Sequence, residues 1–145
     1  MLEFISNSPE ETLAIAENFA VELNSGDVIA FRGDLGSGKT CFTRGLALGI
    51  GFNGDVTSPT FALINEYLGG RLNIYHFDMY RITSWDELYS SGYFEYLEQG
   101  GVVVLEWSEN IENALPDNTT YIEFQKLGEE KRKITIFKKE EKIEI

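Results

Sequence analysis

The sequence predicts an α/β fold, a three-layer domain with a mixed, mostly parallel sheet and a C-terminal antiparallel hairpin. Three observations support it. The apolar run Val28–Phe31 leads directly into a glycine-rich loop and then a helical pattern. A second apolar run, Val102–Leu105, shows no alternation, which is typical of a parallel strand covered on both faces. Near the end of the chain, apolar and polar residues alternate on both sides of Gly128, as in a hairpin.

The length and composition place the chain among globular proteins. At 145 residues it is expected to form a single domain, residues 1–145. No apolar run approaches the ~20 residues that span a bilayer, and Met1–Phe4 lacks the basic and apolar regions of a signal peptide. We therefore expect a cytoplasmic protein without a membrane segment. Its one cysteine, Cys41, excludes an internal disulfide and is expected to be a small buried residue.

The charge argues against direct binding to nucleic acid. The net charge is −12, and only five arginines are present. Affinity for nucleic acid comes mostly from Lys and Arg side chains that neutralise phosphates. A role in a nucleic-acid pathway would therefore pass through another protein.

The central motif is GDLGSGKT at 33–40, which fits the phosphate-binding loop (P-loop) pattern. Its glycines allow positive φ angles and close approach to a ligand. Lys39 supplies charge for the β and γ phosphates, and Thr40 offers a hydroxyl to Mg²⁺. The N-terminus of the following helix adds the positive end of its dipole. The predicted nucleotide-binding residues of the loop are Gly33, Asp34, Leu35, Gly36, Ser37, Gly38, Lys39 and Thr40.

The elements around this loop follow from local patterns. Leu2–Ile5 alternates weakly and is compatible with a first strand. Pro9–Leu23 has apolar residues at helical spacing, after polar residues suited to an N-cap. Behind the loop, Cys41–Leu48 is expected to be helical. Phe61–Tyr67 and Leu72–Asp78 are expected to be strands joined by a Gly-Gly turn.

The second half of the chain alternates short helices and strands. A capping box, with Ser84 at the N-cap and Glu87 three residues later, opens a short helix through Leu88. A second short helix is predicted at 92–97 and a third at 109–115. The hairpin strands are Thr120–Phe124 and Lys133–Phe137, and the charged tail at 138–145 is compatible with a frayed edge strand.

The segment at 57–60 and Trp107 each have two alternative interpretations. Thr57, Ser58, Pro59 and Thr60 stand where nucleotide switches carry a loop that orders around the γ-phosphate. A polar connector with a Pro turn explains the same residues equally well. Trp107 either packs on a base or ribose, or is a buried tryptophan at the rim of the site.

Two acids follow predicted strands and are candidates to complete the site. Asp78 and Glu106 stand at strand ends, where open parallel sheets place their ligands. One would reach Mg²⁺ and the other would position the attacking water, and the sequence leaves open which does which. Strand quality favours Glu106 for the metal. His76 is either a proton shuttle or, as we prefer, a hydrogen-bonded residue that orients its neighbours.

Several separate motifs together resemble the TsaE family, small bacterial P-loop ATPases needed to make threonylcarbamoyladenosine in tRNA. The resemblance covers roughly 9–116. The motifs, in the family's order, are GDLGSGKT at 33–40, TSPTF at 57–61, HFDMYR at 76–81, GYFE at 92–95 and EW at 106–107.

The resemblance implies a P-loop NTPase-like fold and a weakly hydrolysing ATPase that uses ATP and Mg²⁺. It implies that Thr40 and Glu106 lie on the metal side, and that Asp78 is important for hydrolysis beside Lys39. Trp107 would lie near the nucleotide, and the segment at Pro9 near the adenine. It also implies that the chain acts as a switch on a complex of TsaB and TsaD, with tRNA held by these partners.

Two other classes of function are weighed. A small-molecule kinase on the same scaffold would usually carry several lid arginines, and five arginines without a cluster argue against it. A nucleotide-binding interaction module would show no physiological hydrolysis. No guanine-reading Asn-Lys-x-Asp motif is present, which favours ATP over GTP.

Overall fold

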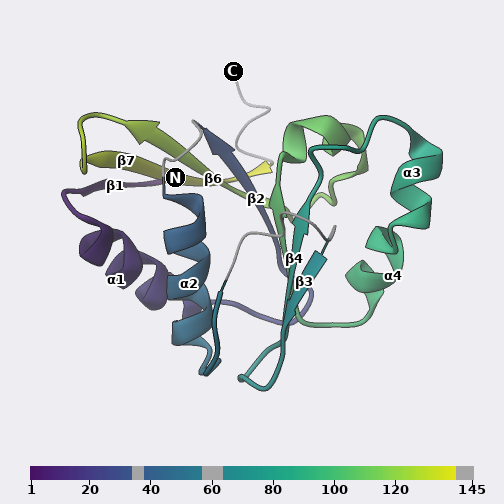
Figure 1. The fold of residues 1–145 in the computed structure, drawn as a ribbon, viewed down its shortest axis with the longest axis horizontal. Helices are drawn as coiled ribbons and strands as arrows, with labels where there is room; N and C mark the ends of the chain where they lie inside the picture. The colour runs from purple at the N-terminus through teal and green to yellow at the C-terminus, as the bar shows by residue number, and fades with distance from the viewer. Residues whose placement is uncertain (34–37, 57–63, 140–145) are drawn as a thin grey trace.

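The computed structural model describes residues 1–33, 38–56 and 64–139. In this part of the chain, seven strands form one sheet with helices on both sides (Figure 1). In chain order the elements are β1 Leu2–Ser6, α1 Pro9–Ala20, β2 Val28–Gly33, α2 Lys39–Gly49, β3 Ile64–Tyr67, β4 Ile74–Asp78, α3 Trp85–Ser90, α4 Tyr93–Glu98, β5 Val102–Glu106, the 3₁₀ helix η1 Ser108–Ala114, β6 Thr120–Lys126 and β7 Arg132–Lys138.

The sheet is parallel in its middle and antiparallel at both margins. Its strand order is β1-β7-β6-β2-β5-β4-β3. The pairs β6/β2, β2/β5 and β5/β4 are parallel, whereas β1/β7, β7/β6 and β4/β3 are antiparallel. The expectation of a mostly parallel sheet therefore holds only for the middle. Short turns between β3 and β4 and between β6 and β7 allow only antiparallel neighbours. The predicted C-terminal hairpin is confirmed.

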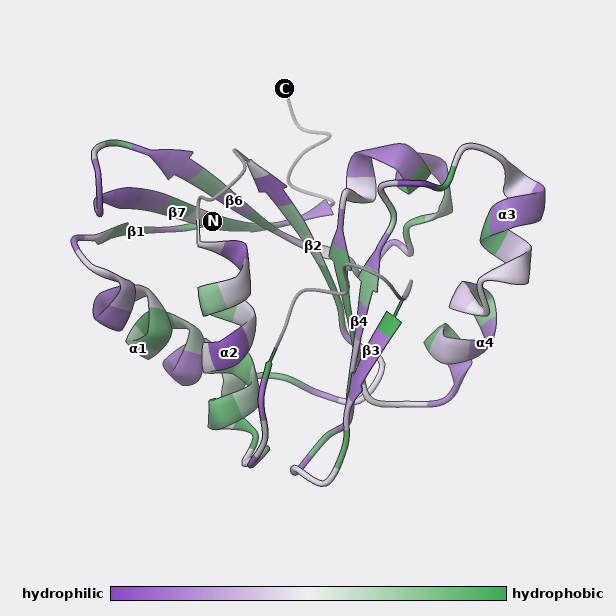
Figure 2. Ribbon diagram, viewed as in Figure 1, coloured by the Kyte–Doolittle hydropathy of each residue, from purple (hydrophilic) through white to green (hydrophobic). Residues whose placement is uncertain are grey.

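Two hydrophobic cores lie on the two faces of the sheet and give the three predicted layers. Helices α1 and α2 cover one face, and α3, α4 and η1 lie on the other (Figure 1). Strand β2 serves both faces, because Ile29 and Phe31 point to the first core and Val28 and Ala30 to the second. Hydrophobic colouring accordingly runs along the central strands, and much of the outer surface of the helices is hydrophilic (Figure 2).

Helices α1 and α2 approach so closely that α2 needs glycine at two positions. A Cβ built on Gly45 would lie 2.5 Å from the Cβ of Ala16 and 2.5 Å from the carbonyl oxygen of Leu13. A Cβ on Gly49 would lie 2.5 Å from the Cβ of Ala20. The first helix is thereby held against the helix that follows the P-loop motif.

Most predicted element positions are confirmed, with shifts at the ends. Helix α1 ends at Ala20 rather than Leu23, and Arg71 donates to the carbonyl oxygens of both residues there. Strand β4 begins at Ile74 rather than Leu72. The capping box is confirmed, since the Ser84 hydroxyl accepts from the N–H of Glu87. The helix expected at 109–115 is the 3₁₀ helix η1.

Several predictions fall outside the described residues. These concern Asp34, Leu35, Gly36 and Ser37 of the loop, Thr57, Ser58, Pro59 and Thr60 of the candidate switch, the strand residues 61–63 and the tail from 140. Within the described ranges, no helix is long and apolar enough to cross a bilayer.

Candidate functional site

Two glycines of the P-loop motif lie in backbone conformations that favour glycine. Gly33 ends β2 with φ at 121°, and a Cβ there would lie 2.2 Å from the carbonyl oxygen of Phe124 on β6. Gly38 is the N-cap of α2 with φ at 112°, in the left-handed region. Any other residue would be strained at Gly38 and would clash with the neighbouring strand at Gly33.

Helix α2 begins without the caps that the other long helix and α3 have. Ser8 and Ser84 accept backbone hydrogen bonds at the starts of α1 and α3, and acidic residues occupy their first turns. Among the described residues, the start of α2 has no side-chain cap and no acid in its first turn. Its free N–H groups and dipole therefore favour an anion, in a chain that is otherwise acidic.

Lys39 and Thr40 form this first turn of α2, and both are half-buried. The Thr43 hydroxyl donates to the Lys39 carbonyl oxygen at 3.0 Å. Three residues after Lys39, the ring of Phe42 packs on Phe31 of β2, with centroids 6.0 Å apart. This contact places the start of α2 over the end of β2.

The start of α1 lies beside the start of α2. The Cys41 thiol donates to the Pro9 carbonyl oxygen at 3.3 Å. Cys41 is half-buried rather than fully buried as expected. Burial raises the pKa of its thiol, and the nearby Arg44 opposes that shift only in part. Pro9 itself is exposed, and its carbonyl oxygen contacts Cys41, the residue that follows the P-loop motif.

The two candidate acids meet at the same edge of the sheet. Asp78 ends β4, Glu106 ends β5, and the two are paired in the parallel register. Both side chains are on the face that α2 covers, since Ile74 and Val104, at even spacing before them, belong to that core. Strand β5 lies next to β2, and β4 lies one strand further out. Glu106 is thus on the strand adjacent to the P-loop strand.

The two acids are held in different ways. Asp78 Oδ1 accepts the N–H of Tyr80 at 2.9 Å, which is a local turn contact. Glu106 Oε2 lies 2.6 Å from Nε2 of His76, which is fully buried. The other ring nitrogen of His76 lies 3.0 Å from the Tyr67 hydroxyl. The preferred interpretation of His76, a residue that orients its neighbours, agrees with this geometry.

Trp107 follows Glu106 in a strained backbone conformation. Its φ of 59° places it in the left-handed region, where among described residues it is the only non-glycine. Its ring packs on Tyr80, with centroids 4.9 Å apart, and is 38% exposed. The interpretation as a buried tryptophan is therefore wrong. An exposed aromatic pair stands beside the ends of β4 and β5.

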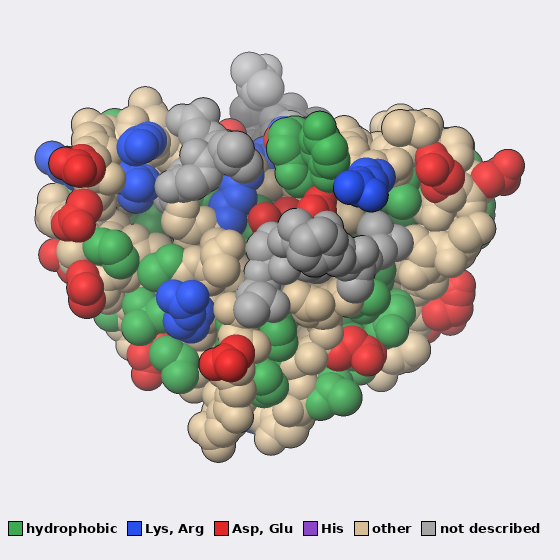
Figure 3. Space-filling model, in the orientation of Figure 1, with side chains coloured by type: hydrophobic (Ala, Val, Ile, Leu, Met, Phe, Trp, Pro, Cys, Tyr) green, Lys and Arg blue, Asp and Glu red, His purple; other side chains and the backbone are tan. Residues whose placement is uncertain are grey.

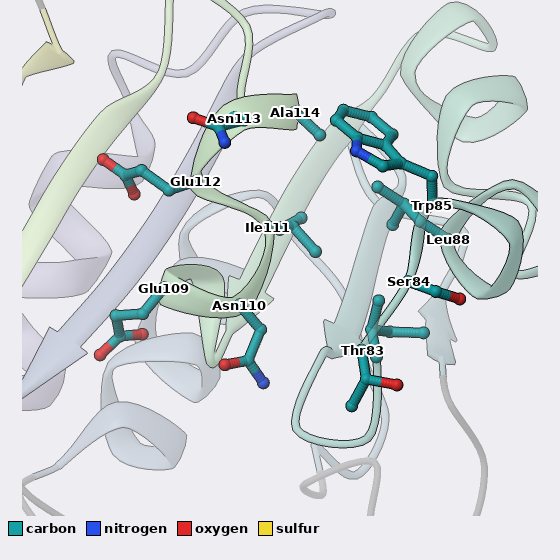
Figure 4. Close-up of a pocket in the computed structure, with 11 residues that line it drawn as sticks. Thr83, Ser84, Trp85, Leu88, Glu109, Asn110, Ile111, Glu112, Asn113 and Ala114 are labelled. Atoms are coloured by element: carbon teal, nitrogen blue, oxygen red, sulfur yellow. The ribbon is translucent and has the colours of Figure 1, made fainter.

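A pocket of about 190 Å³ lies on the other face, between α3 and η1 (Figure 4). Thr83, Ser84 and Trp85 line one side of it, and Glu109 and Glu112 stand on the opposite side. None of the predicted site residues lines this pocket. The candidate site is instead the sheet edge to which α2 brings Lys39 and Thr40, and β4 and β5 bring their terminal acids.

Arg32, just before the loop, belongs to a structural cluster. It forms an ion pair with Glu112 of η1, and its guanidinium lies 4.6 Å from the ring centroid of Tyr121. Tyr121 donates to the other carboxylate oxygen of Glu112 at 2.9 Å. Sequence reasoning identified neither this cluster nor Tyr67, because both depend on contacts between distant segments. Finding either of them would have required knowing which distant segments are neighbours in the fold.

The described residues contain no cluster of three or more His, Cys, Asp or Glu side chains placed to hold a metal ion. A Mg²⁺ ion bound by one hydroxyl, one carboxylate and phosphate oxygens needs no such cluster. Figure 3 shows acidic side chains both at the margins and near the centre of one face of the molecule, with Lys and Arg mostly in its upper half.

Comparison with known proteins gives the family. The sequence model described as "Threonylcarbamoyl adenosine biosynthesis protein TsaE" matches residues 6–134. The chain belongs to the TsaE family. The recognition made from the motifs is thereby confirmed, and it extends beyond the range 9–116 that carried them.

Individual TsaE proteins match along most of their length. The chain is 43% identical over 134 residues to the tRNA threonylcarbamoyladenosine biosynthesis protein TsaE of Bacillus subtilis, covering 92% of this chain and 84% of that one. It is 39% identical over 132 residues to the TsaE of Treponema pallidum, covering 91% and 97%. A crystal structure of YdiB from Bacillus subtilis matches with a TM-score of 0.78 at 39% identity, over 93% of this chain and 83% of that one.

Membership of the TsaE family places the chain in the biosynthesis of threonylcarbamoyladenosine in tRNA. The family name concerns this pathway and implies work alongside other Tsa proteins.

Proposed function

We propose that this TsaE-family chain is an ATP- and Mg²⁺-binding ATPase of the P-loop NTPase fold with a low intrinsic rate, acting as a switch on a complex of TsaB and TsaD. The observation that carries the proposal is that the uncapped start of α2, which follows β2, lies at the same edge of the sheet as the terminal acids of β4 and β5. This edge offers backbone N–H groups and Lys39 for phosphates, and carboxylates for a cation.

The residues fit the nucleotide and metal in type and placement. The glycine positions leave room that a Cβ would fill at Gly33 and provide the left-handed turn at Gly38. In this proposal Thr40 and Glu106 hold Mg²⁺, and Lys39 neutralises charge on the β and γ phosphates. Glu106 is preferred for the metal because β5 is adjacent to β2. A Mg²⁺ ion held there would neutralise charge that develops on the phosphates.

Asp78 has a different role in the proposal. It lies one strand further from the loop than Glu106, and its Oδ1 is held by the N–H of Tyr80. A carboxylate fixed at this distance can accept a hydrogen bond from a water molecule and orient it for attack. Trp107 and Tyr80 offer an exposed aromatic surface beside the site, and the Pro9 carbonyl oxygen contacts Cys41 in the first turns of α2.

The arginines support a slow reaction in the isolated chain. Arg32 is paired with Glu112, Arg71 binds carbonyl oxygens at the end of α1, and Arg132 binds carbonyl oxygens of its own hairpin. Only Arg44 and Arg81 remain exposed without such contacts in the described part of the chain. An arginine finger can raise the rate of phosphoryl transfer by ~10³ to 10⁵. A partner is proposed to complete the site.

Phosphate release with and without the partners tests the proposal. The wild-type chain, Glu106→Ala and Asp78→Ala would be compared alone and with TsaB and TsaD. We expect slow release by the chain alone, faster release with partners, and loss in both variants. Equal rates for wild type and Glu106→Ala would favour an interaction module without hydrolysis. Transfer of phosphate to a metabolite would favour the alternative, a small-molecule kinase.

A further inference from the structure

A buried chain of hydrogen bonds crosses three neighbouring strands and ends on Glu106. The Tyr67 hydroxyl of β3 lies 3.0 Å from Nδ1 of His76 on β4, and Nε2 of His76 lies 2.6 Å from Glu106 Oε2 on β5. His76 is fully buried and Tyr67 is 3% exposed, whereas the Glu106 side chain is 13% exposed. Only the last member reaches the surface.

The register of the sheet brings His76 within hydrogen-bonding distance of both Tyr67 and Glu106. Tyr67 is paired with Ile74, and His76 stands two residues beyond Ile74 on the same face. His76 is paired with Val104, and Glu106 stands two residues beyond Val104. Each hydrogen bond therefore joins diagonal neighbours across a strand pair, which long side chains can bridge. From Tyr67 to Glu106, each member of this hydrogen-bonded series therefore lies nearer to the edge of the sheet that carries the P-loop motif.

The donors and acceptors have one consistent arrangement with an ionised Glu106 and a neutral imidazole. A carboxylate can only accept, so Nε2 of His76 must carry the hydrogen. Nδ1 is then an acceptor, and the Tyr67 hydroxyl donates to it. The Glu106 carboxylate thus selects the tautomer with its hydrogen on Nε2, and the Tyr67 hydroxyl stabilises that tautomer by donating to Nδ1.

Glu106 depends on this contact more than Asp78 depends on any side chain. Asp78 is fixed by the backbone N–H of Tyr80, two residues away. The one hydrogen bond to the Glu106 carboxylate within the described residues is that from His76 to Oε2. Its Oε1 has no hydrogen bond there and is the oxygen left for a cation.

We propose that His76 is a positioning residue: its Nε2–H holds Oε2 of Glu106, so that Oε1 is presented to the cation of the bound nucleotide, and the Tyr67 hydroxyl supports this arrangement by donating to Nδ1 of His76. The inference rests on the function proposed above and adds the means by which the metal-side carboxylate is oriented. It predicts a defect in metal affinity when His76 is replaced, beyond any loss of stability.

The affinity of the chain for Mn²⁺ in the presence of a non-hydrolysable ATP analogue, measured by electron paramagnetic resonance, tests the role. Loss of an outer-shell partner typically weakens metal binding about tenfold to a hundredfold, and we expect this for His76→Leu. His76→Gln should retain most of the affinity, because its amide N–H can replace Nε2–H. Tyr67→Phe should fall between the two.

A matched control separates orientation from stability. Thr119→Val removes another buried side-chain hydrogen bond, to the Pro116 carbonyl oxygen, just before β6 begins and so at the opposite edge of the sheet. It should lower the midpoint of urea unfolding without changing Mn²⁺ affinity. Equal Mn²⁺ affinity in wild type, His76→Leu and His76→Gln would overturn the proposal. So would an equal loss in His76→Gln and His76→Leu when both are folded.

A second measurement needs no variant and no ligand. Nitrogen-15 spectra of the imidazole in the wild-type chain should show the tautomer with hydrogen on Nε2, and the opposite tautomer would refute the inference. If His76→Leu does not fold, this spectrum and the His76→Gln affinity decide. If the wild type binds no nucleotide, the proposed function fails, and the spectrum alone decides whether Glu106 is held by His76.

Discussion

Replacing Gly45 by alanine should destabilise the protein, although alanine favours a helix. Gly45 lies inside α2, where alanine is better than glycine by about 1 kcal/mol in helix propensity. The added methyl group would lie 2.5 Å from the Cβ of Ala16 and 2.5 Å from the Leu13 carbonyl oxygen. Carbon atoms in contact lie at about 3.5–4.0 Å. The helices must therefore separate by roughly 1 Å.

The size of the effect follows from these opposing contributions. Overpacking of a tight contact costs about 1–3 kcal/mol, and the upper half of that range applies because one obstacle is a backbone carbonyl. Subtracting the propensity gain leaves a net loss of about 1–2 kcal/mol in the free energy of unfolding. At 145 residues the loss corresponds to a fall of about 3–7 °C in Tm.

Urea unfolding followed by circular dichroism measures this loss. The double variant Ala16→Gly, Gly45→Ala removes one of the two clashes. Its destabilisation should be smaller than the sum for the two single variants. A Gly45→Ala protein that is more stable than wild type by about 1 kcal/mol, as propensity alone predicts, would refute the close helix contact.

Three further outcomes are expected. Lys39→Ala should abolish ATP binding, measured by isothermal titration calorimetry, with an unchanged circular dichroism spectrum, because Lys39 lies at the start of α2 and leaves the cores untouched. Ser84→Ala should cost about 0.5–2 kcal/mol in urea unfolding through loss of the α3 cap. Burial, and then the Glu112 carboxylate, raise the pKa of Tyr121 to about 12 from the ordinary 10.0. Because the folded-state pKa is the higher one, this stabilisation is complete below pH 10 and is lost as the pH rises from about 10 to 12.

Each of these expectations can fail in a defined way. Unchanged ATP affinity in Lys39→Ala would mean that the loop has been misinterpreted. A Ser84→Ala protein as stable as wild type would show that α3 is held by packing alone. For Tyr121, the urea midpoint at pH 9 and pH 11 should fall less in Tyr121→Phe than in wild type. An equal fall in both would assign the pH dependence to other groups such as Tyr93, whose pKa burial also raises.

Local signals in the sequence predicted the elements well. The Ser84 capping box begins α3 as expected, and the apolar run at 102–105 forms the buried part of β5 between β2 and β4. These predictions succeeded because caps and apolar runs act within a few residues of the chain. The end of α1 was misplaced, because Arg71, some fifty residues later, binds the carbonyl oxygens there.

Contacts between strands could not be predicted in the same way. Periodicity tells which face a side chain occupies, not which strand lies beside it. The order of Asp78 and Glu106 relative to the P-loop strand, and the contact between His76 and Glu106, became visible only with the parallel register of β4 and β5. The left-handed backbone at Trp107 also has no local signal, since glycine or asparagine is usual there.

The lone thiol at the start of α2 is a ready chemical reporter. Only the thiolate reacts with alkylating reagents, so the raised pKa of Cys41 and its contact with Pro9 make labelling slow while the starts of α1 and α2 stay together. Faster labelling by iodoacetamide would report their separation without any engineered probe. A cysteine introduced elsewhere for spectroscopy would require replacement of Cys41 first.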